Sequence, residues 1–172
     1  MGRRVMSGDE APRDAAAVRV FPPAIPLAAI LLAWGLQKVW PLRLDEWPGA
    51  AQRPWLGWGV AVGALVLLGA WSVALFRRSG QSENPWKPTT EIVQRGPYRV
   101  TRNPMYLQMV LIVFGVGIAT GNGWMLLLAP VTGWALQRWV IGPEEAYLER
   151  KFGEPYQAYK RRVRRWLGRR SG

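Results

Sequence analysis

Two groups of polar residues could carry out chemistry in this chain of 172 residues. Residues 96–106 hold two tyrosines, two arginines and Asn103, and the second group begins with the paired acids Glu144 and Glu145. The chain has no cysteine and no histidine, which removes thiolate chemistry, the usual general base and the commonest metal ligand. The sequence therefore predicts no metal site, and a reaction that depends on carboxylates, phenols, guanidinium groups, amides and their geometry.

The rest of the chain is arranged in apolar blocks joined by charged connections. Hydrophobic residues make up 49% of the sequence, yet the mean hydropathy is only −0.04. The blocks are residues 22–42, 55–76, 104–120 and 124–141. About 20 helical residues cross a hydrocarbon core of about 30 Å. The predicted fold is all-α: an integral membrane bundle of about four transmembrane helices with a C-terminal amphipathic cytosolic helix.

The chain divides into three predicted parts. Residues 1–21 mix charges with alanines and are predicted to form a flexible cytosolic tail, residues 22–76 the first two transmembrane helices, and residues 77–172 the catalytic region. Lys and Arg are concentrated between residues 77 and 103 and after Gly142, whereas the other connections hold only Arg43 and Arg53. This excess predicts cytoplasmic termini in a bacterial inner membrane. A tryptophan belt is expected at the opposite face: Trp40, Trp47, Trp55, Trp58 and Trp124.

The last two apolar blocks should bring the polar groups together. Asn122 marks the turn between them, and Asn103 lies 19 residues before it while Glu144 lies 22 residues after it. In an antiparallel helix pair these depths differ by about one turn. Tyr98, Asn103, Tyr106 and Glu144 are therefore expected around one cavity at the cytosolic surface, where a water-soluble reagent could meet a lipophilic substrate.

Each group also has a simpler interpretation. Asn103 and Pro104 could cap and begin a helix, and Pro143 with the two acids could begin another. Arginines and tyrosines beside a transmembrane segment are usually anchors at the membrane surface. Helix capping alone would not require Tyr98, Tyr106 and a pair of acids at the same depth in the membrane. The combination of these residues therefore favours a shared site.

Residues 80–166 resemble the membrane methyltransferases typified by isoprenylcysteine carboxyl methyltransferases and phospholipid N-methyltransferases. The matching residues are Gly96, Tyr98, Arg102, Asn103, Pro104 and Tyr106 in the first part, and Glu144, Glu145, Leu148, Phe152, Gly153, Tyr156 and Tyr159 in the second. Asn103 stands where the eukaryotic pattern has histidine, and its amide can donate and accept hydrogen bonds but cannot exchange a proton. Val140 stands where carboxyl methyltransferases place a substrate-binding arginine, which argues against a prenylcysteine carboxylate as substrate.

The resemblance implies that S-adenosylmethionine is the cofactor. It places the cofactor against Glu91, Ile92, Val93, Tyr98, Asn103, Pro104, Met105, Tyr106 and Glu144. Glu144 would accept hydrogen bonds from the cofactor, with Glu145 in support or in solvent, and the tyrosines would line the adenosine or the sulfonium cation. The cofactor carboxylate or an anionic acceptor would bind Arg99, Arg102 or Arg138, the nearest base to Val140. Catalytic roles are thus predicted for Arg138 and Glu144.

The acceptor is expected to be lipophilic and to arrive sideways between the helices. No general base is evident, which suits a carboxylate, a thiolate or an amine. The basic segment from Tyr147 to Leu167 has apolar residues at helical spacing, with Gly153 and Pro155 dividing it in two. It is predicted to lie on anionic lipid, since nucleic acid is a poor partner beside a membrane.

Two other functions remain open at this point. Membrane reductases of sterols or steroids share a related C-terminal helical arrangement and would use NADPH, although their signature is not kept here. A non-enzymatic membrane adaptor would bind lipid or a partner through the basic tail, and would tolerate substitutions at Tyr98 and Glu144.

Overall fold

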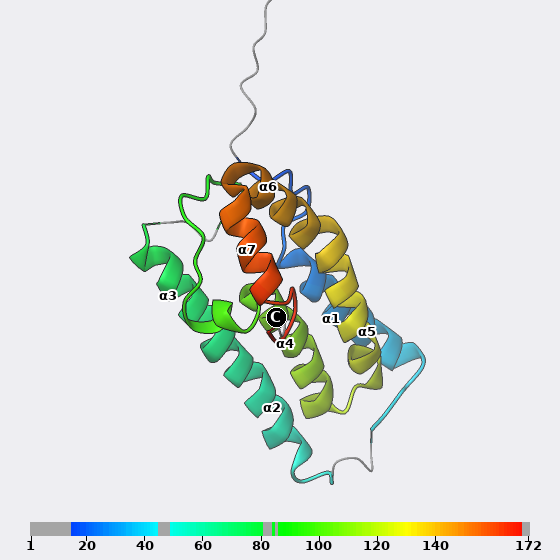
Figure 1. Ribbon diagram of the computed structural model, residues 1–172. Helices are drawn as coiled ribbons and strands as arrows, with labels where there is room; N and C mark the ends of the chain where they lie inside the picture. The colour runs from blue at the N-terminus through cyan, green and yellow to red at the C-terminus, as the bar shows by residue number, and fades with distance from the viewer. Residues whose placement is uncertain (1–14, 45–48, 81–83, 85, 170–172) are drawn as a thin grey trace, which may run out of the picture.

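Helices occupy all four predicted apolar blocks in the computed structural model, which describes residues 15–44, 49–80, 84 and 86–169 (Figure 1). Within these residues there is no named strand, and the only bridges pair Arg43 with Asn122 and Val163 with Arg169. The α-helices are α1 Ala24–Val39, α2 Arg53–Ala64, α3 Trp71–Arg78, α4 Pro104–Thr120, α5 Gly123–Leu136, α6 Gly142–Phe152 and α7 Glu154–Arg162. Two π-helical segments, η1 Leu65–Ala70 and η3 Gln137–Ile141, and a 3₁₀ turn, η2 Gly96–Arg99, complete the set. The all-α prediction is confirmed.

The longest apolar helix is formed by α2, η1 and α3, which run on without a break from Arg53 to Arg78. Among the described residues it is the one helix long and apolar enough to cross a membrane, with 26 residues and a mean hydropathy of 2.2 over an 18-residue window. The apolar helices α1 and α4 are shorter, with 16 and 17 residues. Trp47, which was expected in the tryptophan belt, lies outside the described residues.

The predicted turn between the last two apolar blocks is confirmed. Gly121 ends α4 in the left-handed conformation (φ +68°), which glycine adopts without strain. The Asn122 side chain then caps α5 by accepting a hydrogen bond from the Met125 amide at 3.3 Å. Its amide group donates to the Ala33 carbonyl at 3.3 Å, which fixes the turn against α1. Figure 1 shows this turn at the opposite end of the bundle from α6.

The second helical arm does not restart at Pro143, as the capping interpretation proposed. Residues 123–152 form one continuous helical path, in which the π segment η3 joins α5 to α6. The Gly142 amide reaches back to the Gln137 carbonyl, a π-type bond immediately before Pro143. Because proline has no amide hydrogen, a wider turn at this point lets the helix continue through it. Glu144 and Glu145 therefore extend from the same rigid element as the apolar α5.

Two small residues let α2 and α4 cross at close range. A Cβ atom added at Gly57 would lie 2.5 Å from the Gly115 carbonyl oxygen and closer still to Ala119. A Gly57→Ala variant should lose about 1–3 kcal/mol of unfolding free energy, because backbone atoms cannot move aside as a flexible side chain can. The matched control is Gly59→Ala, where nothing lies within 4 Å of the new methyl group. Denaturation in mild detergent compares the two, and equal stability would contradict this close packing.

The N-terminal segment differs from its prediction. Ala16 and Val18 are buried in a core cluster with Tyr106, Leu136 and Ile141, so residues 15–21 are not a loose tail; residues 1–14 lie outside the described part. Trp86 fixes the segment by donating to the Val18 carbonyl at 2.8 Å and stacking on Phe21, with ring centroids 6.2 Å apart. These contacts join residues far apart in the sequence, so the local sequence could not predict them.

The C-terminal segment breaks where predicted but packs elsewhere. Gly153 (φ +57°) separates α6 from α7, as expected. The apolar face of α7, with Tyr156 and Tyr159, packs on Ile92 and Phe152 of the protein rather than facing lipid. The apolar side chains of α7 are therefore buried inside the protein, and contact of the basic segment with anionic lipid stays a prediction for its exposed charged side chains.

Candidate functional site

A pocket opens where the loop before α4, the start of α4, and the α6–α7 pair meet. Its empty space, including the open mouth, is about 830 Å³. All nine residues predicted to contact a cofactor line it: Glu91, Ile92, Val93, Tyr98, Asn103, Pro104, Met105, Tyr106 and Glu144. Arg102, Glu145, Tyr147, Tyr156 and Tyr159 also line it. The spacing argument therefore placed Tyr98, Asn103, Tyr106 and Glu144 around one cavity correctly, and the three residues 91–93, which the resemblance implied, line the same cavity.

The contact between Glu144 and Tyr106 joins the two polar groups directly. The Tyr106 hydroxyl donates to Glu144 Oε1 at 2.5 Å, across 38 residues of sequence. Burial raises the pKa of Glu144 to about 7; the Tyr106 hydrogen bond opposes this shift and the neighbouring Glu145 charge adds to it. A carboxyl group that changes charge near neutral pH thus borders the pocket, at its junction with α4.

Tyr98 forms another part of the wall. The 3₁₀ turn η2 places it in the interior, with its ring 5.8 Å from that of Phe76 and its carbonyl accepting from the Tyr159 hydroxyl at 2.7 Å. Burial raises the pKa of Tyr98, so the phenol stays neutral. It presents an aromatic face and a hydroxyl group, both of which suit an organic cation or a nucleoside.

Glu145 is buried between two arginines rather than solvated. Its Oε1 accepts from Arg102 Nε at 3.1 Å and Nη2 at 2.8 Å, and its Oε2 accepts from Arg165 Nε at 3.1 Å and Nη2 at 2.6 Å. Burial alone would raise the pKa of Glu145, but the hydrogen bonds from Arg165 and Arg102 outweigh it, so the pKa is lowered. The two adjacent acids therefore have opposite environments, and Glu145 supports the site while Glu144 faces the pocket.

The residues immediately before α4 are fixed by the C-terminal segment. The Arg102 amide donates to the Arg164 carbonyl at 3.1 Å, and the Gly168 amide donates to the Val100 carbonyl at 2.7 Å. The Thr101 hydroxyl donates to the Arg165 carbonyl at 3.1 Å. Sequence reasoning did not identify Thr101 or Arg165 as part of the site, because Arg165 is one of several arginines in a basic run.

Asn103 does not cap α4 with its side chain. Its amide nitrogen donates instead to the Arg165 carbonyl at 3.1 Å and to Glu145 Oε1 at 3.4 Å. The capping interpretation of Asn103 is therefore wrong. The side chain ties α4 to α6 while it lines the pocket, so any direct cofactor contact would be made in addition to these bonds.

Arg138 lies away from the pocket, although it was predicted to be catalytic. It precedes Glu144 by six residues across the π segment η3, and the two side chains line different hollows. Arg138 is exposed and lines a separate depression, while Val140 is fully buried. Arg99 is also exposed and does not line the pocket, which leaves Arg102 as the one arginine among the described residues that line it.

A second, apolar cavity adjoins the first. It lies between the start of α1, the 65–77 stretch of the long helix and α4, with an empty space of about 1420 Å³ including its mouth. The two cavities share Asn84, Met105 and Tyr106. Its other lining residues are mostly apolar, with Gln108 and Arg77 as exceptions. Tyr106 thus lines both the pocket that holds Glu144, called the polar pocket below for its acidic and phenolic side chains, and the apolar cavity.

Comparison with known proteins identifies the family. The sequence model of the family described as "Phospholipid methyltransferase" matches residues 58–155. An uncharacterised protein of Haemophilus influenzae (strain ATCC 51907 / DSM 11121 / KW20 / Rd) is 40% identical over 63 residues, which are 37% of this chain and the whole of that relative. No solved structure gives a significant match. Since the family match covers more than half of the chain, including Tyr98, Tyr106 and Glu144, this protein belongs to the phospholipid methyltransferase family.

Proposed function

We propose that this protein transfers a methyl group from S-adenosylmethionine to a lipophilic acceptor at the cytosolic surface of a membrane. Family membership supports methyl transfer in general. The observation that carries the finer proposal is the position of Tyr106, which bonds Glu144 in the polar pocket and also lines the apolar cavity. Transfer from a water-soluble donor to a lipophilic acceptor requires two adjoining cavities of this kind that share a lining residue.

The chemistry of the polar pocket fits this donor. Glu144 can accept hydrogen bonds from hydroxyl or amino groups, and the buried rings of Tyr98 and Tyr106 can lie against an adenine or a sulfonium cation. The cofactor supplies an electrophilic methyl group. Glu144, Tyr98 and Tyr106 bind and orient, and the rigid α5–η3–α6 path holds Glu144 in place.

The apolar cavity is proposed to hold the hydrophobic part of the acceptor. The reacting atom of the acceptor would reach the shared wall at Met105 and Tyr106. Held by Glu144, Tyr98 and Tyr106, S-adenosylmethionine would supply its methyl group to a lone pair of that atom. A carboxylate or thiolate needs no base, and an amine can lose its proton to water after transfer.

The proposed membrane arrangement has four crossing helices. The 53–78 helix has the length and composition to span alone, while α1, α4 and the α5–η3 arm would cross beside it. Exposed tryptophans and leucines along α1 and α2, among them Trp34, Leu31 and Trp55, support contact with lipid. The positive charge near α3 and after Gly142 supports an inner-membrane protein with both termini cytoplasmic, whose exposed basic side chains meet anionic lipid.

The pH dependence of donor binding follows from Glu144. Because its pKa is raised to about 7, the ionised form that accepts hydrogen bonds is scarce at pH 6 and predominates at pH 8. Affinity for S-adenosylhomocysteine, measured by calorimetry, should rise about tenfold over this range. A Glu144→Gln variant should show a flat profile. An affinity that falls as the pH rises would contradict this role.

The function itself is tested by incubating purified protein with methyl-labelled S-adenosylmethionine and a bacterial lipid extract. The expected result is label in a lipid-soluble product, which mass spectrometry then identifies. Parallel titration with NADPH separates a reductase from a methyltransferase. Binding of NADPH without binding of the methyl donor, or no labelled product together with harmless substitutions at Tyr98 and Glu144, would overturn the proposal.

A further inference from the structure

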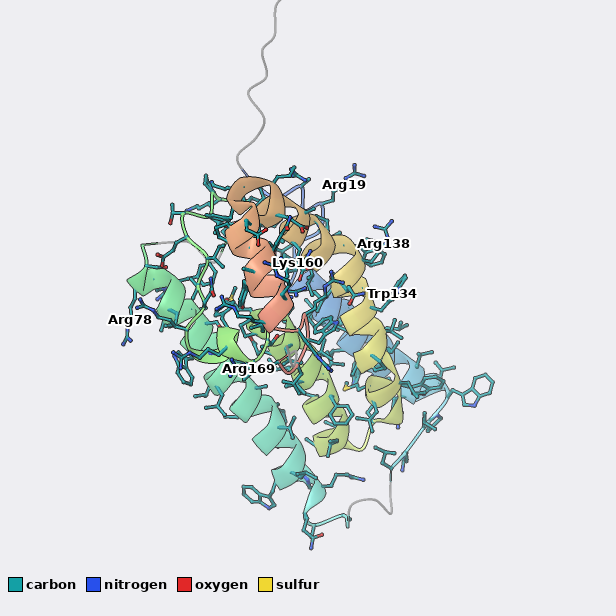
Figure 2. All side chains as sticks on the ribbon, in the orientation of Figure 1. Arg19, Arg78, Trp134, Arg138, Lys160 and Arg169 are labelled. Carbon is teal, nitrogen blue, oxygen red and sulfur yellow. The ribbon has the colours of Figure 1, made fainter. Side chains whose placement is uncertain are left out.

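A third hollow, the depression that Arg138 lines, lies outside both the donor pocket and the apolar cavity, on the outward side of the α5–η3–α6 arm. Its lining includes Trp134, Gln137, Arg138, Pro143 and Arg165, and its empty space is about 740 Å³ including the open mouth. Of the described residues that line it, two are arginines and none is an acid. Figure 2 shows Trp134 and Arg138 together on the outer side of this arm. The lining chemistry suits an anion.

Both arginines are available in part to such an anion. Arg138 is exposed, and the side chain of Arg165 is 36% exposed. Arg165 uses Nε and Nη2 for Glu145, and its Nη1 takes no part in that pair. Guanidinium groups bind phosphate through parallel N–H donors, and two of them in one depression can share a single phosphate group. The Glu145 pair also holds Arg165 in a fixed place.

The position of the depression selects among possible phosphates. The outward residues of α5 before it are apolar and exposed: Leu127 at 56%, Val131 at 51% and Trp134 at 61%. Trp134 and Trp139 form an edge-on pair, with ring centroids 6.0 Å apart, beside Arg138. Apolar side chains, then tryptophan, then arginine is the order in which a helix meets acyl chains, interface and headgroups. The net charge of +12 favours an anionic headgroup.

We propose that the depression between Arg138 and Arg165 is a binding site for the phosphate group of an anionic phospholipid, whose chains lie along Leu127, Val131 and Trp134. This site is separate from the methyl-transfer pocket and does not depend on the proposed activity. It also gives Arg138, which does not line the donor pocket, a ligand of its own.

The test measures lipid retention by the full chain in a neutral detergent, using native mass spectrometry. Phosphatidylglycerol is the probe and phosphatidylcholine the zwitterionic comparison. Wild-type protein should retain one phosphatidylglycerol in preference to phosphatidylcholine. Arg138→Gln should weaken this retention about tenfold, and Arg138→Lys should restore part of it because the charge remains. The matched control is Arg164→Gln, which removes the same charge from an exposed side chain outside the depression.

Three outcomes would overturn the proposal. Equal losses in Arg138→Gln and Arg164→Gln would mean diffuse attraction to the basic surface. Equal retention of phosphatidylcholine and phosphatidylglycerol would mean that the site does not distinguish an anionic headgroup from a zwitterionic one. Displacement of the lipid by millimolar inorganic phosphate alone would mean a site for soluble phosphate. None of these readouts requires methyl transfer, so failure of the lipid site and failure of the enzymatic proposal are distinguishable.

Discussion

A Glu144→Gln variant is expected to bind S-adenosylhomocysteine about 10- to 100-fold more weakly than the wild-type protein. Glutamine keeps the shape of the side chain and can still accept from Tyr106, but it removes the negative charge. Hydrogen bonds to a charged partner contribute about 1.5–3 kcal/mol each, which corresponds to this range of affinity. Isothermal titration at pH 8, where Glu144 is mostly ionised, measures the effect at its largest.

Two further variants make this result specific. Glu149→Gln removes another acid of α6, one that pairs with Lys160 and whose side chain is 36% exposed, and it should leave donor affinity unchanged. Tyr106→Phe should lie between the wild type and Glu144→Gln, because it removes the 2.5 Å hydrogen bond but keeps the ring. Unchanged affinity in Glu144→Gln, or an equal loss in Glu149→Gln, would remove Glu144 from the donor site.

A Glu145→Ala variant is expected to have the largest effect on stability, a loss of about 3–5 kcal/mol of unfolding free energy. The acid is 4% exposed, and the side chain of Arg102 beneath it is 5% exposed. Without Glu145 the guanidinium of Arg102 stays buried and keeps only its bonds to the Lys160 and Val163 carbonyls. An uncompensated buried charge is far costlier than a lost surface pair. Chemical denaturation followed by tryptophan fluorescence measures the loss.

The control for this prediction is Glu149→Ala, which breaks the partly exposed pair with Lys160 and should cost no more than about 1 kcal/mol. A double variant, Arg102→Met with Glu145→Leu, should recover most of the stability lost in Glu145→Ala, because it removes both charges together. If Glu145→Ala is no less stable than Glu149→Ala, the buried cluster does not hold the C-terminal segment in place.

The sequence predicted the helices and the meeting of the polar groups because both depend on length and local pattern. Apolar blocks of about 20 residues form helices that are buried or in contact with lipid, regardless of their tertiary contacts. Gly121, Asn122 and Gly123 favour a turn because of their backbone and capping preferences. Once the turn is fixed, helical rise alone sets Asn103 and Glu144 at similar depth. That is why Tyr106 and Glu144, 38 residues apart, could be predicted to lie around one cavity, although their hydrogen bond could not.

The parts that could not be predicted depend on helix phase and on long-range side-chain contacts. Arg138 was misplaced because a residue near the site in sequence can face the opposite side of a helix, and the π segment η3 alters the phase further. Arg165 could not be distinguished from the other arginines of the tail, since its contact with Glu145 is tertiary. The packing of residues 15–21 depends on Trp86, which lies 68 residues from Val18 in the sequence. No local sequence pattern predicts this contact.

The most direct test of the central claim is to locate the donor itself. Ultraviolet crosslinking of labelled S-adenosylmethionine to the full chain, followed by peptide mapping, should place the label in residues 91–106 and 144–159, and excess S-adenosylhomocysteine should prevent labelling. Label confined to other segments, such as α1 or α2, or labelling that S-adenosylhomocysteine does not reduce, would contradict a donor site at Tyr98, Tyr106 and Glu144.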